Sequence, residues 1–166
     1  MRVPYGNKSA DNIKLFAREI SGFLKSLGVK AIVVACNTVS SIALEVVKEE
    51  GGMEVFGVIE PGAKFAIEKT KTGRIIVIGT RATANSHSYL NKIKDINPSI
   101  SVVEKACPLF VPIVEENFVN HEASRLIAEE YLGEFKKTDY DSIILGCTHY
   151  PLLKKVIAEV LPGVSI

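Results

Sequence analysis

Cys36 and Cys147 occupy equivalent places in two similar stretches of the sequence, "IVVACNT" at residues 32–38 and "ILGCTHYP" at residues 144–151. In each stretch an apolar run leads to the cysteine, and a predicted helix follows it. A thiol can donate a proton, and its thiolate can act as a base or a nucleophile. Two thiols placed in the same way indicate a site with one sulfur on each side.

Both cysteines are expected where a buried strand ends and a helix begins. Ligands of open parallel sheets gather beyond the carboxyl ends of the strands. A helix N-terminus offers unpaired N–H groups and a partial positive charge, which favour a thiolate and are expected to lower the cysteine pKa below about 8.5. Asn37, Thr38 and Thr148 add hydrogen-bonding groups in the same turns. The two turns together predict a small pocket that binds anions.

Other interpretations of the cysteines involve different chemistry. A zinc site made of Cys36, Cys147 and His149 lacks the closely spaced ligand pairs of structural zinc sites. A redox pair would more typically have the spacing Cys-x-x-Cys. A single cysteine at a strand end is usually a small buried hydrophobic residue, but the matching flanks argue against this for the pair. Cys107, in "KACPLF", is predicted to be such a packed structural residue.

Strand-like and helix-like stretches alternate along the chain. Continuous apolar runs such as "KAIVVA" and "GRIIVIG" are typical of parallel strands that are covered on both faces. The fold class is therefore predicted to be α/β, with mostly parallel sheets flanked by helices and a boundary near residues 59–73. Strands are expected at 30–35, 53–59, 73–79, 100–104 and 141–146, and helices at 8–27, 39–50, 61–71, 82–95, 109–117, 120–135 and 151–160.

Composition excludes several classes of protein. The 166 residues are 47% hydrophobic and 23% charged, which suits a globular core. The net charge is +1 without a basic arm, so nucleic acid is not an expected partner. No apolar run reaches the roughly 18 residues of a membrane-spanning helix, and the N-terminus lacks a secretory pattern. Three widely spaced cysteines form no disulfide framework, so a cytoplasmic location is expected.

Six motifs resemble, in the same order, those of the glutamate racemase family in the aspartate/glutamate racemase superfamily. This resemblance covers the chain nearly end to end and implies two similar α/β half-domains and no cofactor. Other superfamily members, which act on amino acids such as aspartate, usually differ after the second cysteine. The motifs are "VPYGNKS" (3–9), "VVACNT" (33–38), "VFGVIEPG" (55–62), "VIGTRAT" (77–83), "ACPLFVPIVEE" (106–116) and "LGCTHYPLL" (145–153).

The resemblance implies interconversion of L- and D-glutamate, which supplies D-glutamate for peptidoglycan and thus for cell wall biogenesis and cell shape. Inversion at the α-carbon needs a base on one side and an acid on the other, which explains two similar thiols. By resemblance, Cys36 takes the α-proton of D-glutamate and Cys147 that of L-glutamate. His149 and Glu115 resemble the supporting acid/base pair of the second cysteine, although Glu116 adjoins Glu115.

The resemblance also implies a set of substrate-binding residues but no metal ligands. Thr80 and Thr83 are equally typical of an ordinary helix cap. His87 and His121 match no site motif and are expected to be surface or capping residues. The implied substrate-binding residues are Pro4, Tyr5, Gly6, Asn37, Thr38, Thr80, Thr83 and Thr148.

The sequence departs from the family pattern in its first half. The family has a strand with a "DSGVGG" motif before its "PYG" loop, whose aspartate assists the first cysteine and whose serine contacts substrate, and the sequence lacks this motif. By resemblance, residues 1–59 form a partial first half-domain and residues 60–166 a more complete second one. Weak or absent racemisation is expected. The alternatives are a non-catalytic racemase-like fragment and a racemase that acts on another amino acid such as aspartate. The expected partners are a small-molecule substrate and a second copy in a homodimer.

Overall fold

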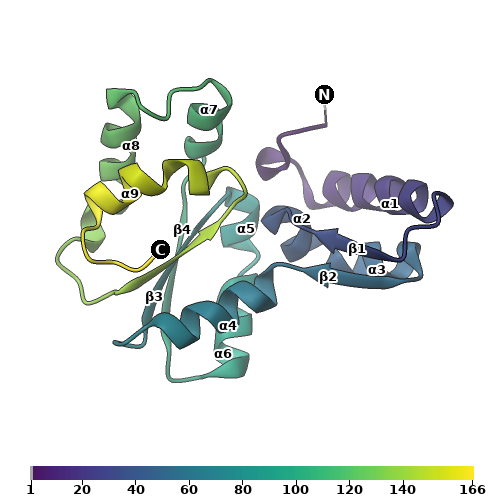
Figure 1. Ribbon diagram of the computed structural model, residues 1–166, viewed down its shortest axis with the longest axis horizontal. Helices are drawn as coiled ribbons and strands as arrows, with labels where there is room; N and C mark the ends of the chain where they lie inside the picture. Colours follow the sequence, from purple (N-terminus) through teal and green to yellow (C-terminus); the bar gives the residue numbers. More distant parts are fainter. Residues whose placement is uncertain (1) are drawn as a thin grey trace.

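The computed structural model describes residues 2–166, which form two parallel sheets with helices packed against them (Figure 1). The N-terminal sheet has the order β1-β2 and the C-terminal sheet the order β4-β3-β5. The elements are η1 (Tyr5–Asn7), α1 (Ala10–Ser26), β1 (Ala31–Val34), α2 (Asn37–Ile42), α3 (Leu44–Gly51), β2 (Glu54–Gly57), α4 (Ile59–Lys69), β3 (Arg74–Gly79), α5 (Arg81–Asn85), α6 (Ser88–Ile96), β4 (Ser101–Ala106), α7 (Phe110–Glu115), α8 (Glu122–Leu132), η2 (Gly133–Phe135), β5 (Ser142–Gly146), η3 (Tyr150–Leu153) and α9 (Lys154–Val160).

The C-terminal sheet is covered on both faces, as the sequence predicts. Alternate side chains of the central strand β3 lie on opposite faces of the sheet. Ile75 and Val77 pack with α4 and α6. Ile76 and Ile78 pack with α7, α8 and α9. These four side chains are at most 1% exposed. β3 pairs in parallel with both neighbours, so the carboxyl ends of all three strands lie at the same edge of the sheet.

The N-terminal sheet is covered on one face. Ile32 and Val34 of β1 pack against α1, α2 and α3, which follows from the amphipathic spacing of these helices. On the other face, Val33 and its register partner Phe56 are 69% and 53% exposed. The prediction that the β1 strand is covered on both faces is therefore wrong for residues 2–166.

Several predicted helices differ in detail from those observed. The helix expected at 39–50 is two helices, because the backbone of Ala43 leaves the helical region between α2 and α3. The helix expected at 82–95 is divided by His87, whose φ is 52°. The one expected at 151–160 begins as the 3₁₀ helix η3. Apolar periodicity does not reveal such breaks, because the pattern continues across one or two irregular residues.

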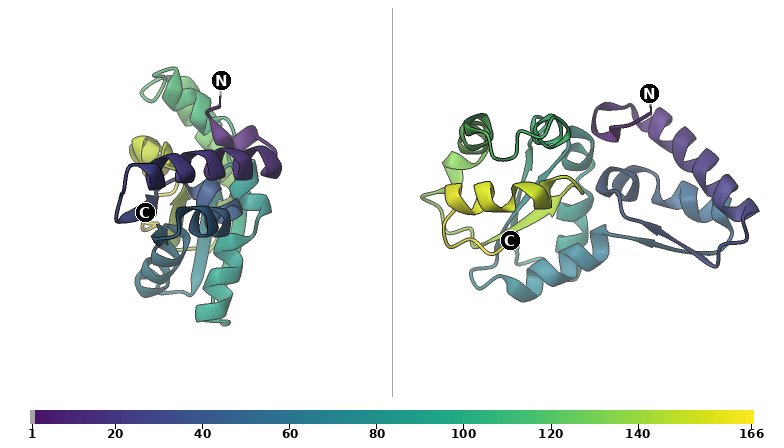
Figure 2. Two further views of the ribbon diagram at one scale, coloured as in Figure 1. Left: turned by 90° about the vertical axis from the view of Figure 1, so that its right-hand side faces the viewer. Right: turned by 45° about the horizontal axis from the view of Figure 1, so that its top comes forward.

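The chain crosses between the two sheets once, at the connection from β2 to α4. We call residues 2–58 the N-terminal part and residues 59–166 the C-terminal part; Figure 2 shows them side by side. Among the described residues, each of the three buried apolar clusters lies within a single part. No helix of residues 2–166 is long and apolar enough to cross a membrane.

Candidate active site

Cys36 lies at the carboxyl end of β1 and is the N-cap residue of α2. Its side chain is half-buried. It borders an apolar pocket of about 180 Å³ between α1 and β1, whose lining includes Tyr5, Ile32 and Val39. The sequence correctly places this thiol between a strand and a helix.

Cys147 follows β5 directly and begins a chain of three reactive side chains. Its sulfur lies 3.7 Å from Nδ1 of His149, and Nε2 of the same ring is bonded to Oε1 of Glu115 at the end of α7. Glu115, rather than the adjoining Glu116, makes this contact. The arrangement of carboxylate, imidazole and thiol can move a proton between sulfur and ring nitrogen, because the carboxylate holds the ring in place.

Burial controls the acidity of Cys147. The residue is 8% exposed, and burial raises the pKa of its thiol to about 11. The backbone N–H groups of His149 and Tyr150 lower the pKa, as expected for this turn, but less than burial raises it; a charge on Cys36 raises it further. The expectation of a lowered pKa is therefore wrong for Cys147: near pH 7 it is a thiol, and it needs a base such as His149 to become a thiolate.

The pH dependence of alkylation tests this pKa. Because only the thiolate reacts, we expect the rate of modification of Cys147 by iodoacetamide to rise about tenfold per pH unit from pH 7, and to level off near pH 11. Mass spectrometry of the Cys147 peptide measures the rate. Fully buried Cys107, whose pKa burial raises to about 12, is the internal control and should react far more slowly.

A plateau below pH 8 would contradict this prediction. A group whose pKa is raised on folding stabilises the chain below its unfolded pKa and loses that contribution as the pH rises through its folded pKa. For Cys147 this loss falls between its ordinary value of 9.0 and about 11. Circular dichroism at each pH therefore accompanies the measurement, so that unfolding is not mistaken for ionisation.

Three threonine hydroxyls join the two parts of the chain near Cys36. The Oγ1 atom of Thr38 lies 3.0 Å from that of Thr80 and 3.3 Å from that of Thr83, and the latter two are 3.1 Å apart. Thr80 also caps α5 by accepting a hydrogen bond from the backbone N–H of Thr83, so its predicted role as a helix cap is confirmed. Gly6 packs on Thr80, since a β-carbon there would lie 2.6 Å from Thr80 Cγ2.

Asn37 has a partner that the sequence does not suggest. The buried hydroxyl of Tyr89, on α6, donates a hydrogen bond of 2.7 Å to Oδ1 of Asn37, at the start of α2. The two residues are 52 positions apart. Tyr89 occupies a core position of an amphipathic helix, and no motif around it indicates a contact with the site.

The remaining predicted residues lie near the site or outside it. Pro4 precedes η1, and the ring of Tyr5 stacks on that of Phe16. Thr148 is exposed in the turn after Cys147. His87 is exposed and pairs with Glu104, and His121 caps α8, so neither belongs to the site. Cys107 is fully buried, as predicted.

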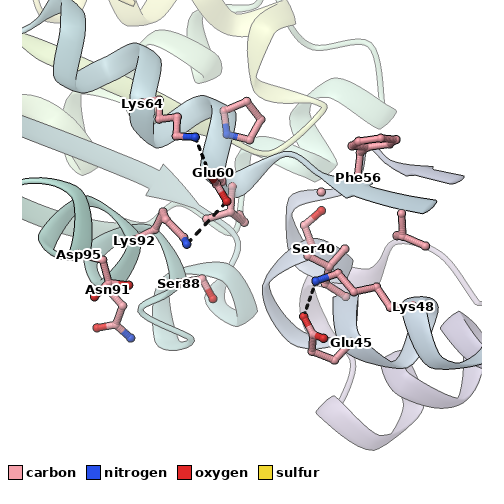
Figure 3. A pocket seen from close by; sticks show the side chains of 15 residues that line it. Ser40, Glu45, Lys48, Phe56, Glu60, Lys64, Ser88, Asn91, Lys92 and Asp95 are labelled. Carbon is pink, nitrogen blue, oxygen red and sulfur yellow. Dashed lines mark hydrogen bonds and ion pairs between the residues drawn. The ribbon is translucent and has the colours of Figure 1, made fainter. Parts of the chain in front are cut away.

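A larger pocket lies away from the thiols. It has a volume of about 760 Å³ and is lined from both parts of the chain. Figure 3 shows that most of its charged groups pair with each other: Glu60 contacts Lys64 and Lys92, and Glu45 contacts Lys48, whereas Asp95 is drawn without such a contact. Because most of these charges are paired and no thiol lines the pocket, we place the candidate active site at Cys36 and Cys147. Within the described residues, no three His, Cys, Asp or Glu side chains are grouped to hold a metal ion, so the zinc interpretation gains no support.

The fold is α/β, with a cysteine after a strand of each parallel sheet. One of these cysteines contacts His149, which is bonded to Glu115, so the site is suited to proton transfer. The model of the Asp/Glu/Hydantoin racemase family matches residues 1–166, and the chain belongs to this family. It is 51% identical to the glutamate racemase of Chlorobaculum tepidum, over 99% of the chain and 61% of that protein. It is 50% identical to the glutamate racemase of Aquifex aeolicus, over 99% of the chain and 64% of that protein.

Solved structures agree with the fold. The crystal structure of the Francisella tularensis glutamate racemase in complex with D-glutamate matches with a TM-score of 0.92 and 41% identity, over 99% of this chain and 62% of that one. The Bacillus anthracis isoform RacE1 matches with a TM-score of 0.94 and 38% identity, with the same coverage. The prediction of an α/β racemase fold is confirmed. The chain spans 61% of the length of its relative from Chlorobaculum tepidum.

Proposed function

We propose that the chain interconverts L- and D-glutamate by proton transfer between two thiols, without a cofactor, and so supplies D-glutamate for peptidoglycan. The observation that carries this proposal is the contact of Cys147 with His149, itself bonded to Glu115. Both thiols lie just beyond the carboxyl end of a parallel strand. Relatives that are about half identical to the chain are glutamate racemases.

The reaction from L-glutamate begins with a proton moving from Cys147 to His149. The Cys147 thiolate then takes the α-proton: an S–H bond forms, the C–H bond breaks, and the electron pair stays on the α-carbon and its carboxylate. The Cys36 thiol returns a proton to the opposite face, which gives D-glutamate and a Cys36 thiolate. The reaction from D-glutamate runs in the reverse direction. Burial of the site suits this chemistry, since the carbanion must be kept from water.

The substrate carboxylates and ammonium need groups that hold them between the thiols. We assign this role to Asn37, Thr38, Thr80, Thr83 and Thr148, together with Pro4, Tyr5 and Gly6 of the opening loop. The three clustered threonine hydroxyls are bonded to one another, and each can rotate to donate to a carboxylate. We also propose residues 1–59 and 60–166 as two half-domains with the site between them, and a cytoplasmic location, which suits three free cysteines.

Solvent exchange at the α-carbon tests the proposed reaction. Each glutamate enantiomer is incubated with the chain in D₂O, and deuterium at the α-carbon is followed by NMR while chiral chromatography follows inversion. We expect deuterium in both enantiomers, and no exchange with aspartate. Exchange with aspartate and not glutamate would favour the alternative substrate. Glutamate binding without any exchange would favour the non-catalytic alternative.

We further propose that two copies of the chain associate through the open face of the N-terminal sheet. Parallel sheets are almost always covered on both faces, and Val33 and Phe56 lie side by side on this one. Sedimentation velocity should therefore detect a dimer, which Val33→Lys should convert to a monomer. Leu126→Lys is the control, because Leu126 is similarly exposed, at 55%, but lies on α8. A monomeric unaltered chain, or equal effects of both variants, would contradict the proposal.

A further inference from the structure

The hydrogen bond between Tyr89 and Asn37 connects the two parts of the chain at the candidate active site. Tyr89 belongs to α6 and Asn37 to α2, the helix that Cys36 caps. The two side chains are 2% and 7% exposed, so water does not compete for the bond of 2.7 Å. A buried hydrogen bond of this kind can hold an amide in one orientation.

Two glycines border the Tyr89 side chain. A β-carbon at Gly62, in α4, would lie 3.2 Å from Oη of Tyr89, closer than nearly all such contacts. A β-carbon at Gly146, directly before Cys147, would lie 3.4 Å from Cε2 of the ring. The absence of a side chain at Gly62 therefore leaves room for the Tyr89 hydroxyl, whereas Gly146 is constrained mainly by the carbonyl oxygen of Ile78, which a β-carbon there would approach to 2.7 Å.

The direction of this bond determines what Asn37 offers to a ligand. Burial raises the pKa of Tyr89 well above its ordinary value, so the phenol keeps its proton and acts as a donor. The donor occupies Oδ1 of Asn37, and the NH₂ group at Nδ2, with its two N–H donors, remains for other partners. An amide fixed in this way recognises a carboxylate and not an ammonium group.

We infer that Tyr89 is a positioning residue, which fixes the Asn37 amide so that Nδ2 donates to a carboxylate of glutamate. This inference rests on the proposed function, because it concerns the same site. It assigns a role in the site to a residue outside the six motifs that carry the family resemblance. It also explains why Gly62 borders the ring.

The test is the affinity for glutamate of Tyr89→Phe, which keeps the ring and removes the hydroxyl. A neutral hydrogen bond contributes about 1 kcal/mol, so we expect affinity to fall about five- to tenfold, seen as a raised Kd in calorimetry and a raised KM with kcat less affected. In an Asn37→Ala background, Tyr89→Phe should have no further effect on affinity. A merely structural tyrosine would weaken binding to the same extent in both backgrounds.

Two further variants separate positioning from stability. Gly62→Ala should favour the helix α4, yet its methyl group would crowd the Tyr89 hydroxyl at 3.2 Å, so affinity should fall, as in Tyr89→Phe. Tyr131→Phe is the control: its hydroxyl accepts a hydrogen bond from the backbone of Leu109 and contacts no residue of the site. Unchanged affinity in both Tyr89→Phe and Gly62→Ala would overturn the inference.

A measurement without ligand decides the positioning role independently. The side-chain amide resonances of Asn37 are identified by their loss in Asn37→Ala, and they should shift in Tyr89→Phe but not in Tyr131→Phe. An unchanged resonance in Tyr89→Phe would overturn the positioning role. Absence of glutamate binding by the unaltered chain would overturn the proposed function and the ligand assigned to Asn37. The resonance would then still show whether Tyr89 orients the amide.

Discussion

Replacing either Cys36 or Cys147 with serine is expected to abolish the interconversion of glutamate enantiomers. Racemisation needs proton transfer on both faces of the α-carbon, and a serine hydroxyl is a far weaker acid than a thiol. Loss of one positioned acid or base typically lowers a rate by about 10²–10⁴. Chiral chromatography after incubation with each enantiomer in turn measures the loss.

The enantiomer that still exchanges identifies the role of each thiol. Cys36→Ser keeps the base assigned to L-glutamate, and Cys147→Ser keeps the base assigned to D-glutamate. Each variant should therefore retain more α-deuterium exchange with its own enantiomer than with the other. Cys107→Ser is the control, because Cys107 packs in the core and lies outside the site. Full racemisation by either site variant would exclude the two-thiol mechanism.

Replacing His149 with alanine is expected to affect the two enantiomers unequally. With a pKa of about 11, Cys147 is ionised in about one molecule in 10⁴ at pH 7 when no base assists it. Exchange of L-glutamate, which needs the Cys147 thiolate, should fall by about 10²–10⁴. Exchange of D-glutamate should fall less, because Cys147 then acts as the acid and already carries its proton.

Raising the pH should partly restore the His149→Ala variant. Each pH unit above 7 increases the fraction of Cys147 thiolate about tenfold, so its L-glutamate exchange should rise more steeply with pH than that of the unaltered chain. Glu115→Gln is the milder comparison, since it keeps a hydrogen-bonding partner for the ring and removes the charge. Equal losses for both enantiomers, or no recovery with pH, would show that His149 does not activate Cys147.

The order of the elements could be predicted because each core strand is marked by a local run of apolar residues. The four central residues of β3, "IIVI", are apolar without interruption, and the structure buries all four. The same reasoning failed for Val33. A continuous apolar run indicates that a strand is suited to being covered on both faces. Whether helices pack on both faces is decided by the tertiary structure, which the run does not encode.

The positions of the candidate site residues were predictable where these residues are adjacent in sequence. Cys36 and Asn37 follow β1, and Cys147 and His149 follow β5, so strand ends place them. The acidity of Cys147 was not predictable, because the turn and the burial act in opposite directions and only the structure gives their relative size. Tyr89 was missed for a similar reason. Its contact with Asn37 depends on how α6 packs beside α2 and on the space left at Gly62.

The single crossing between β2 and α4 has a consequence for substrate access. No apolar cluster of the described residues spans the two parts. The hydrogen bonds that join the parts include those of the Thr38 hydroxyl with Thr80 and Thr83 and that of Tyr89 with Asn37. These bonds are buried while the parts are together, and water can replace them once the parts separate, whereas separating a shared apolar core would expose hydrophobic surface. Residues 57–59 can therefore serve as a hinge, and under the proposed function we expect the two parts to swing about it to admit glutamate and to close to shield the carbanion, while each apolar core stays intact.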